Sequence, residues 1–393
     1  MGGEIGVTSG ISPSRRADSI TQAEIRAMFI ECERVGGINL AQGTCDTPTP
    51  EPVVQGVRNA LEQGINTYTR YDGLEVLRQA VADKLRTYNG IDVDPETDIV
   101  VSSGSTGAFY AVCLSFLDPG DEVILFEPYY GYHVNTLGSV QAVPVAVKLE
   151  PPDWSFDRAA LEAAVSPRTK MVLVNTPGNP SGKVFSREEL EWIADLTIRH
   201  DLLVVTDEIY EYFLYGGAEH VSPGSLPQIR DRTITISGYS KTFSITGWRI
   251  GYTASDPRWS RIIGYMNDLV YVCAPAPLQF GVAAGINGLD ETFFTDLAVE
   301  YEAKRDRFCS ALDQAGLAPY IPPGAYYVLA DASHLPGENG KARAMHLLDA
   351  TGIASVPGEA FFQGNDAKRY LRFCFAKDDD VLTEACQRLA DLS

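Results

Sequence analysis

Residues 237–251 read Ser-Gly-Tyr-Ser-Lys-Thr-Phe-Ser-Ile-Thr-Gly-Trp-Arg-Ile-Gly, and the apolar run that leads into them, residues 233–237, predicts a buried strand. Lys241 stands just past this strand among small and aromatic residues, so we expect its amine to be partly desolvated. Desolvation lowers the pKa of a lysine and leaves a neutral amine that can act as a nucleophile. Ser240 and Arg249 carry groups that could hold a phosphate beside that amine. The alternative is an ordinary surface loop; a nucleotide-binding P-loop is excluded, because Ser240 stands where that motif requires Gly.

Two polar segments lie upstream, each after an apolar run. Asp207 follows the predicted strand 202–206, at the carboxyl end where α/β sheets place their ligands, and Tyr210 comes three residues later. Residues 175–182 read Asn-Thr-Pro-Gly-Asn-Pro-Ser-Gly after the predicted strand 171–175, which indicates a rigid polar loop compatible with cis prolines. Taken singly, Asp207 could be a helix cap and the loop an ordinary turn.

A third segment joins a predicted strand at 98–101 to a helical stretch at 108–117. It reads Gly104-Ser105-Thr106-Gly107. Backbone N–H groups at a helix N-terminus, with two hydroxyls and no bulky side chains, can cradle a phosphate. The segment lacks the Gly-x-Gly-x-x-Gly spacing of dinucleotide-binding folds, and by itself it is also compatible with a simple turn.

Apolar runs alternate with helical patterns through most of the chain. The runs are continuous, which is typical of strands covered on both faces in a mainly parallel sheet. One intervening helix, at 186–198, opens with the capping box Ser186-Arg187-Glu188-Glu189. The sequence therefore predicts an α/β fold. The predicted strands of its sheet are 98–101, 122–126, 171–175, 202–206 and 233–237.

The last part of the chain has a different pattern. A helical pattern from 278 to 312 is long enough to bridge two domains, and short strands follow it among helices. This mixture predicts a smaller α+β domain. The N-terminal segment, up to about Pro50, is expected to be part of the same domain. The predicted strands there are 326–330, 354–356 and 370–375. The expected regions are an N-terminal arm with part of the small domain (1–49), a large domain (50–285) and a small C-terminal domain with the bridging helix (286–393).

Composition and charge narrow the possible functions. The chain has 393 residues, with 32 Lys and Arg against 52 Asp and Glu, which gives a formal net charge of −20. So acidic a surface repels nucleic acid and anionic lipid, and neither is expected as a partner. No apolar run reaches the roughly 20 residues that span a bilayer, and the N-terminus has no signal-peptide core, which favours the cytoplasm. The seven Cys and five His have no metal-binding spacing, so no metal is expected.

In this order and spacing the polar segments resemble those of fold-type I pyridoxal-phosphate (PLP) enzymes, and within them the class I and II aminotransferases. Residues 240–252 are similar to the family's lysine signature, 175–182 to its Asn-Pro-x-Asn-Pro-Thr-Gly loop, and 207–210 to its pyridine-nitrogen site. The resemblance covers about residues 38–389. It implies a large PLP domain in α/β/α layers around a mainly parallel seven-stranded sheet, a smaller α+β domain, and a homodimer with shared active sites.

The resemblance implies a role for each matching residue. Lys241 would form the Schiff base with PLP and shuttle a proton, and Asp207 would pair with the pyridine nitrogen. Asn179 and Tyr210 would bond the phenolic oxygen of the ring, and Tyr130 would stack on it. Lys241, Asp207 and Tyr210 are the implied catalytic residues. The implied phosphate ligands are Ser105, Thr106, Ser240, Arg249 and, reaching across to the other subunit, Tyr68.

The resemblance also implies how substrate is bound. Arg372, in Tyr370-Leu371-Arg372-Phe373, matches the arginine that grips the substrate α-carboxylate, with Gly43 and Asn179 beside it. Dicarboxylate-specific members add a second arginine after the lysine, contributed by the partner chain. No Lys or Arg occurs between residues 261 and 304, so an uncharged amino acid is the expected donor. The weak point is the N-terminal arm, whose arginines could serve instead: Arg15, Arg16 and Arg26.

The chain departs from the family pattern at two places. Thr44 and Cys45 follow Gly43 where the family often has an aromatic or acidic residue and then Pro, and this segment is expected to line the substrate side. Gly238 stands where many members have a phosphate-binding hydroxyl, so that contact is either missing or replaced by Ser237.

The expected function is transfer of the amino group of an amino acid to a 2-oxo acid in two ping-pong half-reactions. A PLP enzyme that eliminates, replaces or cyclises at the β- or γ-carbon is the alternative, because the cofactor residues are shared. A PLP-sensing transcription regulator would need a DNA-binding module, and none precedes Ile38. Donor, acceptor and pathway stay open at this point.

Overall fold

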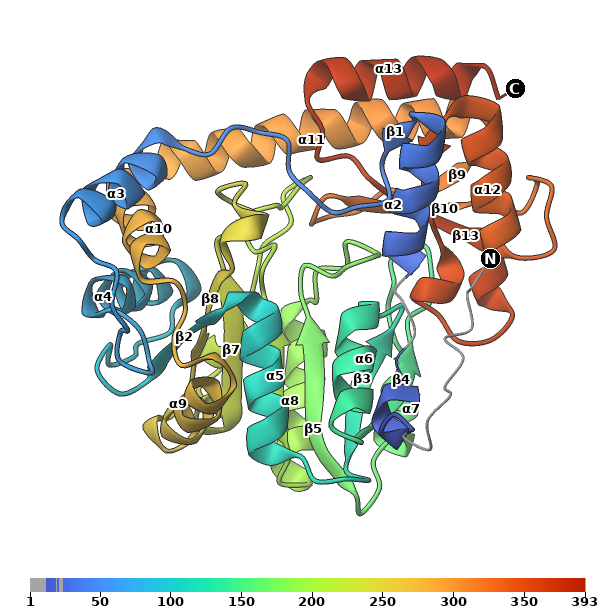
Figure 1. Cartoon of the computed structure of the whole chain (residues 1–393). Helices are drawn as coiled ribbons and strands as arrows, with labels where there is room; N and C mark the ends of the chain where they lie inside the picture. Colours follow the sequence, from blue (N-terminus) through green and yellow to red (C-terminus); the bar gives the residue numbers. More distant parts are fainter. Residues whose placement is uncertain (1–11, 19, 21–23, 393) are drawn as a thin grey trace.

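A computed structural model describes residues 12–18, 20 and 24–392 of the chain. Its core is a seven-stranded sheet with the order β2-β8-β7-β6-β5-β3-β4 (Figure 1). β8 runs antiparallel to its two neighbours, and all other adjacent pairs are parallel. The predicted α/β fold with a mainly parallel sheet is therefore confirmed. The strands are β2 (Ile99–Ser103), β3 (Glu122–Glu127), β4 (Val143–Lys148), β5 (Thr169–Asn175), β6 (Leu203–Asp207), β7 (Thr233–Gly238) and β8 (Ile250–Ala254).

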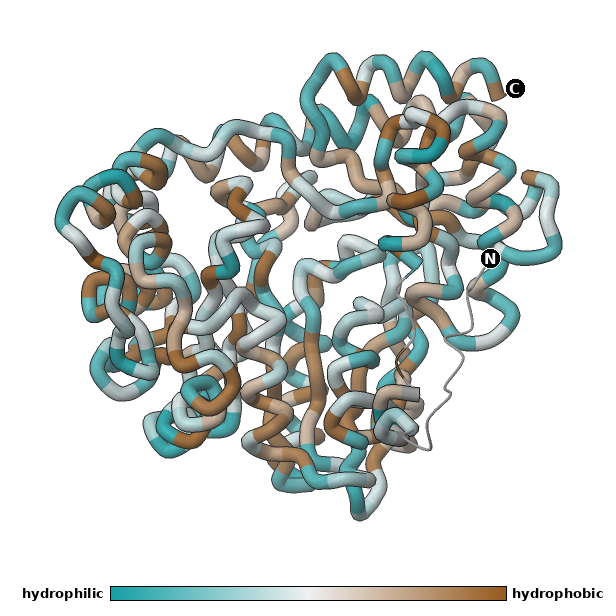
Figure 2. Tube along the Cα trace, in the orientation of Figure 1, coloured by the Kyte–Doolittle hydropathy of each residue, from teal (hydrophilic) through white to brown (hydrophobic). Residues whose placement is uncertain are grey.

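Side chains of the central strands point alternately to the two faces of the sheet. In β3, Val123 and Leu125 belong to one apolar cluster with residues of α5 (Gly104–Phe116). Ile124, between them, packs in a second cluster with residues of α8 (Arg187–Arg199). Both faces are thus covered by helices, which explains the continuous apolar runs in the sequence. Figure 2 shows hydrophobic stretches along the central strands, which form the middle layer.

The helices over the sheet begin where the sequence supplies caps. At the start of α8, the Ser186 hydroxyl accepts from the Glu189 N–H and the Glu189 carboxylate accepts from the Ser186 N–H, which confirms the predicted capping box. Before α9, the Asp256 carboxylate accepts from the Arg258 N–H. The remaining helices beside this sheet are α6 (Gly131–Ser139), α7 (Arg158–Ala163) and α9 (Pro257–Tyr271).

The helical pattern predicted from 278 to 312 is two helices, α10 (Ala276–Gly288) and α11 (Glu291–Gln314). They are separated at Asp290, whose carboxylate accepts two backbone hydrogen bonds and caps α11. The expectation of one continuous helix is therefore wrong. α11 alone runs along the top of the molecule toward the C-terminal part (Figure 1). α10 packs mainly against α3 (Glu51–Glu62) and α4 (Glu75–Lys84).

The C-terminal part has its own antiparallel sheet, in the order β12-β13-β10-β9. The segment before α3 joins this part, because β1 (Ile38–Asn39) pairs with β11. Residues 1–11, 19 and 21–23 of the predicted arm lie outside the described residues. None of the described helices has both the length and the apolar character needed to cross a membrane. The elements here are α2 (Glu24–Val35), β9 (Ala318–Tyr320), β10 (Tyr327–Asp331), α12 (Gly340–Thr351), β11 (Ile353–Ala354), β12 (Val356–Pro357), β13 (Tyr370–Cys374) and α13 (Asp379–Ala390). The short helix α1 (Arg15–Asp18) instead contacts α6 of the large domain.

Candidate active site

Lys241 lies in the turn after β7, where the large sheet meets the smaller one. Its Nζ donates to the carbonyl oxygen of Gly43 at 3.0 Å. The same atom lies 5.9 Å from the ring centroids of both Tyr210 and Tyr326. Burial among these groups lowers the pKa of the Lys241 amine. The desolvation expected from the sequence therefore has a structural cause, the aromatic enclosure of the amine.

Asp207 ends β6 and is buried in the site. Its Oδ2 lies 3.0 Å from Nε2 of His133, and its Oδ1 accepts from the Ile209 N–H at 3.3 Å. His133 comes from α6 and packs edge-to-face against the rings of Tyr130 and Phe109. The histidine and the backbone amide fix the orientation of the carboxylate and shield it from water.

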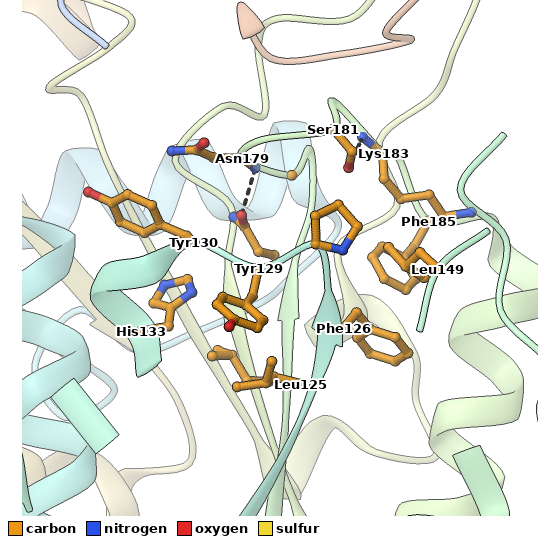
Figure 3. Close-up of a pocket in the computed structure, with 14 residues that line it drawn as sticks. Leu125, Phe126, Tyr129, Tyr130, His133, Leu149, Asn179, Ser181, Lys183 and Phe185 are labelled. Carbon is orange, nitrogen blue, oxygen red and sulfur yellow. Dashed lines mark hydrogen bonds between the residues drawn. The ribbon is translucent and has the colours of Figure 1, made fainter. Parts of the chain in front are cut away.

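The loop after β5 connects Asp207 to Arg372. The Asn175 amide donates to the backbone oxygen of Asp207 at 3.0 Å. Its Oδ1 accepts from the Asn179 N–H at 2.8 Å, which is the bond drawn beside Asn179 in Figure 3. Asn179 Oδ1 then accepts from Arg372 Nη1 at 2.9 Å. Both prolines of the loop follow cis peptide bonds. The loop thus bridges the large sheet and β13.

Arg372 differs from the other buried cations of the described chain. Seven Lys and Arg side chains there are buried, and six of them pair with Asp or Glu. Arg372 is fully buried, its Nε has no partner among the described residues, and its other bonds go to the neutral oxygens of Asn179 and Ala41. An uncompensated buried guanidinium is costly, so this geometry favours an anion. The paired cations are Arg78, Lys84, Lys183, Lys304, Arg305 and Lys377.

Two tyrosines link Arg372 to Lys241. The Arg372 guanidinium lies 4.3 Å from the ring centroid of Tyr327, whose hydroxyl is 2.9 Å from that of Tyr210. Tyr210 in turn faces the Lys241 amine. Burial raises the pKa of both tyrosines, so their hydroxyls stay protonated near neutral pH. One continuous set of contacts therefore runs from Asp207 through the loop and Arg372 to Lys241.

The segment after β2 forms a cradle with Arg249. Gly104 has a φ of +70°, and a Cβ there would lie 2.4 Å from Arg249 Nη2. A Cβ on Gly251 would lie 2.6 Å from the Ser105 nitrogen. Only glycines let the guanidinium approach the start of α5 so closely. A small cavity opens here, lined by Ser105, Thr106, Phe109, Tyr130, Tyr132, His133, Thr136 and Asp207.

Tyr130 lines this cavity and also the neighbouring one drawn in Figure 3. In that view its ring lies beside His133, and Asn179 lies on the loop nearby. Its ring centroid is 5.2 Å from that of Tyr132, in a stacked arrangement. Tyr130 therefore presents aromatic surface to the space between the cradle and the Asn179 loop.

The Ser237 hydroxyl, which could have replaced the phosphate-binding hydroxyl missing at Gly238, points to another group. Ser237 Oγ donates to Glu211 Oε1 at 2.8 Å, and Glu211 pairs with Lys84 at 2.5 Å. Ser237 therefore does not replace the hydroxyl missing at Gly238. Gly238 itself is required by strand packing, since a Cβ there would lie 2.9 Å from the Ile250 oxygen. Ser240 is buried next to Lys241 and is the hydroxyl that remains at this strand end.

Gly43 is enclosed by the C-terminal sheet. A Cβ on Gly43 would lie 1.8 Å from the Tyr327 hydroxyl oxygen, so no larger residue fits without movement. Its carbonyl oxygen accepts from Tyr326 as well as from Lys241. The next residues support the lysine turn: Cys45 Sγ lies 3.4 Å from the Lys241 carbonyl oxygen. Burial raises the pKa of this thiol. A support role for Cys45 was not expected from the sequence.

Tyr68 stands apart from the other predicted residues. Its side chain is 81% exposed. In the described part of the chain, no hydrogen bond or ring contact joins it to the residues around Lys241. The structure therefore brings together every predicted site residue except Tyr68.

His133 and Tyr327 contact the site, and sequence reasoning missed both. His133 had one available signal, since it follows Tyr130 by three residues at the start of a helix and so shares its face. Tyr327 had no such sequence signal, because two adjacent aromatic residues within an apolar strand belong to the hydrophobic core more often than to a functional site. Together the residues offer a buried amine, an oriented carboxylate and two guanidiniums without carboxylate partners among the described residues.

Comparisons with known proteins identify the family of the chain. Residues 35–389 match the model of the family "Aminotransferase class I and II". A probable N-succinyldiaminopimelate aminotransferase of Mycobacterium tuberculosis is 33% identical over 92% of this chain and 93% of its own. Kynurenine–oxoglutarate transaminase 3 of Rattus norvegicus is 34% identical over 88% and 83%. The solved N-succinyldiaminopimelate aminotransferase from Mycobacterium tuberculosis superposes with a TM-score of 0.93 at 32% identity, covering 97% of this chain and all of that one. The chain belongs to the class I and II aminotransferases and has their fold-type I architecture.

Proposed function

We propose that this aminotransferase uses PLP, works as a cytoplasmic homodimer, and transfers the amino group of an amino acid with an uncharged side chain to a 2-oxo acid. One observation carries the proposal. Arg372, a buried arginine without a carboxylate partner in the described chain, is joined by direct contacts to the lysine whose pKa is lowered. An anion-binding group and a neutral amine are what an α-amino acid requires at its two ends.

The donor set fits PLP at both of its ends. The cradle of Gly104 and Arg249 suits an anionic phosphate ester, because a guanidinium and backbone N–H groups converge there and a Cβ would fill the space. Asp207, on the same cavity, can accept a hydrogen bond from a protonated ring nitrogen. Tyr130 supplies a ring face for stacking. The proposed cofactor ligands are Ser105, Thr106, Tyr130, Asn179, Asp207, Tyr210, Ser240, Lys241 and Arg249.

PLP supplies an electron sink for negative charge at the substrate α-carbon. This chain's residues do the remaining work. Arg372 binds the α-carboxylate through two parallel bonds and so orients the substrate, with Asn179 and Gly43 beside it. Lys241 Nζ, when free and neutral, accepts the proton of the substrate α-carbon. Tyr210 would hold the phenolic oxygen of the cofactor through a hydrogen bond from its hydroxyl.

The preference for an uncharged donor rests on where the cations are. Lys377, the buried cation nearest to residues 44–46, already pairs with Asp46 at 3.1 Å. Arg26 lies over the ring of Phe29 on α2. No Lys or Arg occurs between residues 261 and 304. A side-chain carboxylate would therefore be buried without a counter-ion, which binding does not tolerate well.

Steady-state kinetics with a panel of donors tests this function. We expect kcat/KM for phenylalanine, methionine or kynurenine to exceed that for aspartate by about tenfold or more. Keto-acid formation without free ammonia separates transamination from elimination. An advantage of tenfold or more for aspartate would refute the side-chain proposal and direct attention to the N-terminal arm.

The homodimer is supported by exposed apolar residues around Tyr68. Leu269 and Tyr265, near the end of α9, are 79% and 57% exposed. The ring of Tyr71, in the same loop as Tyr68, lies 5.5 Å from that of Tyr265, so loop and helix form one surface. Large exposed apolar surfaces mark interaction sites. A second copy covering this surface would bring Tyr68 to the phosphate cradle of its partner.

A further inference from the structure

We infer that Tyr327 is a positioning residue of this site: its hydroxyl directs the Tyr210 hydroxyl toward the phenolic oxygen of the cofactor, and its ring supports the Arg372 guanidinium. The inference rests on the proposed function, because both groups that it positions act on PLP or on the substrate carboxylate.

Tyr327 is held on every side by the packing. It lies on β10 opposite Cys374 of β13 and is almost fully buried. Its hydroxyl oxygen is so close to Gly43 that a Cβ there would be only 1.8 Å away. Its ring lies beneath Arg372, with 4.3 Å from the guanidinium carbon to the ring centroid. Neither the hydroxyl nor the ring can move without displacing the main chain or Arg372.

The contact between the two hydroxyls has a direction once PLP is bound. Each phenol has one proton to donate. Tyr210 uses its proton in the hydrogen bond to the phenolic oxygen of PLP. The Tyr210 oxygen therefore accepts the hydrogen bond that the Tyr327 hydroxyl donates from 2.9 Å away. In the described chain Tyr327 has no other hydrogen-bond partner to which its proton could go. A hydroxyl that accepts a hydrogen bond is a better donor, so Tyr327 strengthens the bond from Tyr210 to the cofactor.

The ring of Tyr327 adds a second link. A cation held over an aromatic face is attracted by the ring, and the attraction grows when both are shielded from water. Arg372 also lies 4.9 Å from the ring centroid of Phe361, so two rings hold it in place. One side chain therefore touches both the carboxylate clamp and the tyrosine at the cofactor, and the two roles can be separated by substitution.

The test is a pH titration of the bound PLP chromophore in wild type and Tyr327→Phe holoenzyme. A hydrogen bond to the phenolic oxygen stabilises its negative charge and weakens its hold on the proton shared with the Lys241 nitrogen. Losing the support of Tyr327 should therefore raise the apparent pKa of the chromophore, by about half a unit. Because the phenylalanine ring still supports Arg372, KM of Tyr327→Phe should stay within about twofold of the wild-type value. Tyr327→Leu, which removes the ring as well, should also raise KM.

Two controls separate positioning from packing. Tyr215→Phe removes an equally buried hydroxyl, which donates to the Ala325 carbonyl oxygen, while the Tyr215 ring lies 4.9 Å from the Arg305 guanidinium carbon. In the described chain, no hydrogen bond joins this hydroxyl to Tyr210, Tyr327 or Lys241. It should leave the chromophore pKa unchanged. Tyr210→Phe should raise that pKa more than Tyr327→Phe does. In the Tyr210→Phe background, Tyr327→Phe should add nothing, because it acts through Tyr210.

Three results would overturn the inference. The first is an unchanged chromophore pKa in Tyr327→Phe. The second is a change in this pKa when Tyr327→Phe is added to the Tyr210→Phe variant. In both cases the proposed function still stands. Replacement of Tyr327 by 3-fluorotyrosine keeps ring and hydroxyl and makes a stronger donor, so it should lower the pKa even if the phenylalanine variant does not fold. The third contradicting result is a chromophore pKa that rises or does not change in the 3-fluorotyrosine variant. If wild type binds no PLP, the proposed function fails and this inference fails with it.

Discussion

Lys241 is enclosed by Tyr210, Tyr326 and the Gly43 carbonyl, and that enclosure determines its chemistry. Burial disfavours the ammonium form, so the pKa of the amine is lowered and the neutral form exists at lower pH than for an exposed lysine. The carboxylates of the molecule, although numerous, do not pair with this amine in the described residues. The same reasoning applies to Arg372, which cannot lose its proton and therefore needs an anion.

Uptake of PLP by the apoenzyme should depend on pH in a way that reports this pKa. The neutral amine attacks the aldehyde, so the rate should rise with pH and level off above the pKa of Lys241. We expect the midpoint to lie below about 10.4, the ordinary lysine value. Stopped-flow absorbance measures the rate, with free lysine and PLP in solution as the reference. A midpoint at or above that of the free amine would contradict the desolvation of Lys241.

Arg372→Lys tests the carboxylate clamp. An ammonium keeps the charge but cannot form two parallel bonds, so KM should rise by about ten- to a hundredfold for every amino acid tested. PLP binding should be retained, because Arg372 is not a proposed cofactor ligand. Arg369→Lys, three residues earlier and partly exposed, is the control and should change KM little. Unchanged KM in Arg372→Lys would mean that another group holds the carboxylate.

Residue types and spacing pointed to Lys241, to Asp207 and to the loop that contains Asn179, because each follows a predicted strand. The role of Asn179 and the choice of Arg372 came only from the resemblance to the family. Residue types and spacing could not find His133 or Tyr327. A single histidine in a helix and a tyrosine in an apolar strand carry no pattern of their own. Their roles arise from the tertiary fold, which brings α6 to the end of β6 and β10 to the loop after β1.

At the scale of elements, the site forms where β5, β6 and β7 end against the C-terminal sheet. The prediction of these strands was correct within two residues, since each is buried on both faces. β4 was missed because it is a half-exposed edge strand containing Pro144. β8 was missed because its residues read as part of the lysine segment. The break before α11 was missed although Asp290 supplies a recognisable cap.

Gly43→Ala tests the close approach of the loop after β1 to Tyr327 of β10. The added methyl would overlap the Tyr327 hydroxyl, so the strand or the tyrosine must shift. We expect a loss of about 1–3 kcal/mol in the free energy of unfolding and a large loss of kcat/KM. Urea unfolding and steady-state kinetics measure the two effects. Gly138→Ala on α6, where a methyl meets nothing within 4 Å, should be neutral or slightly stabilising. Equal behaviour of the two variants would contradict the packing described at Gly43.

At the scale of the whole molecule, the exposed loop of Tyr68 is the part that a single chain leaves unexplained. Tyr68 is exposed, and Tyr71 of the same loop packs against exposed Tyr265 of α9, which also carries the exposed Leu269; this is consistent with a contact surface. In a two-fold dimer each subunit would supply Lys241 to one site and Tyr68 to the other. Shared sites would allow two defective variants to complement each other in a mixed dimer.

Mixing two defective variants should restore activity. Lys241→Ala lacks the amine, and Tyr68→Ala lacks the residue given to the other site. In a mixed dimer one site has both residues intact, so random reassociation of equal amounts should recover about a quarter of wild-type activity. Subunits exchanged in mild denaturant and then refolded provide the measurement. Activity no greater than the mean of the two parents would contradict shared sites.

Borohydride reduction of the PLP-loaded enzyme, followed by peptide mass spectrometry, tests directly whether Lys241 is the residue that binds the cofactor covalently. The reagent makes the bond between the cofactor and its lysine permanent, so the modified residue can be located in the sequence. We expect one phosphopyridoxyl group per chain, on the peptide that contains Lys241, and none in Lys241→Ala. Modification of a different lysine, or no specific modification at all, would contradict the assignment of Lys241 and the mechanism built on it.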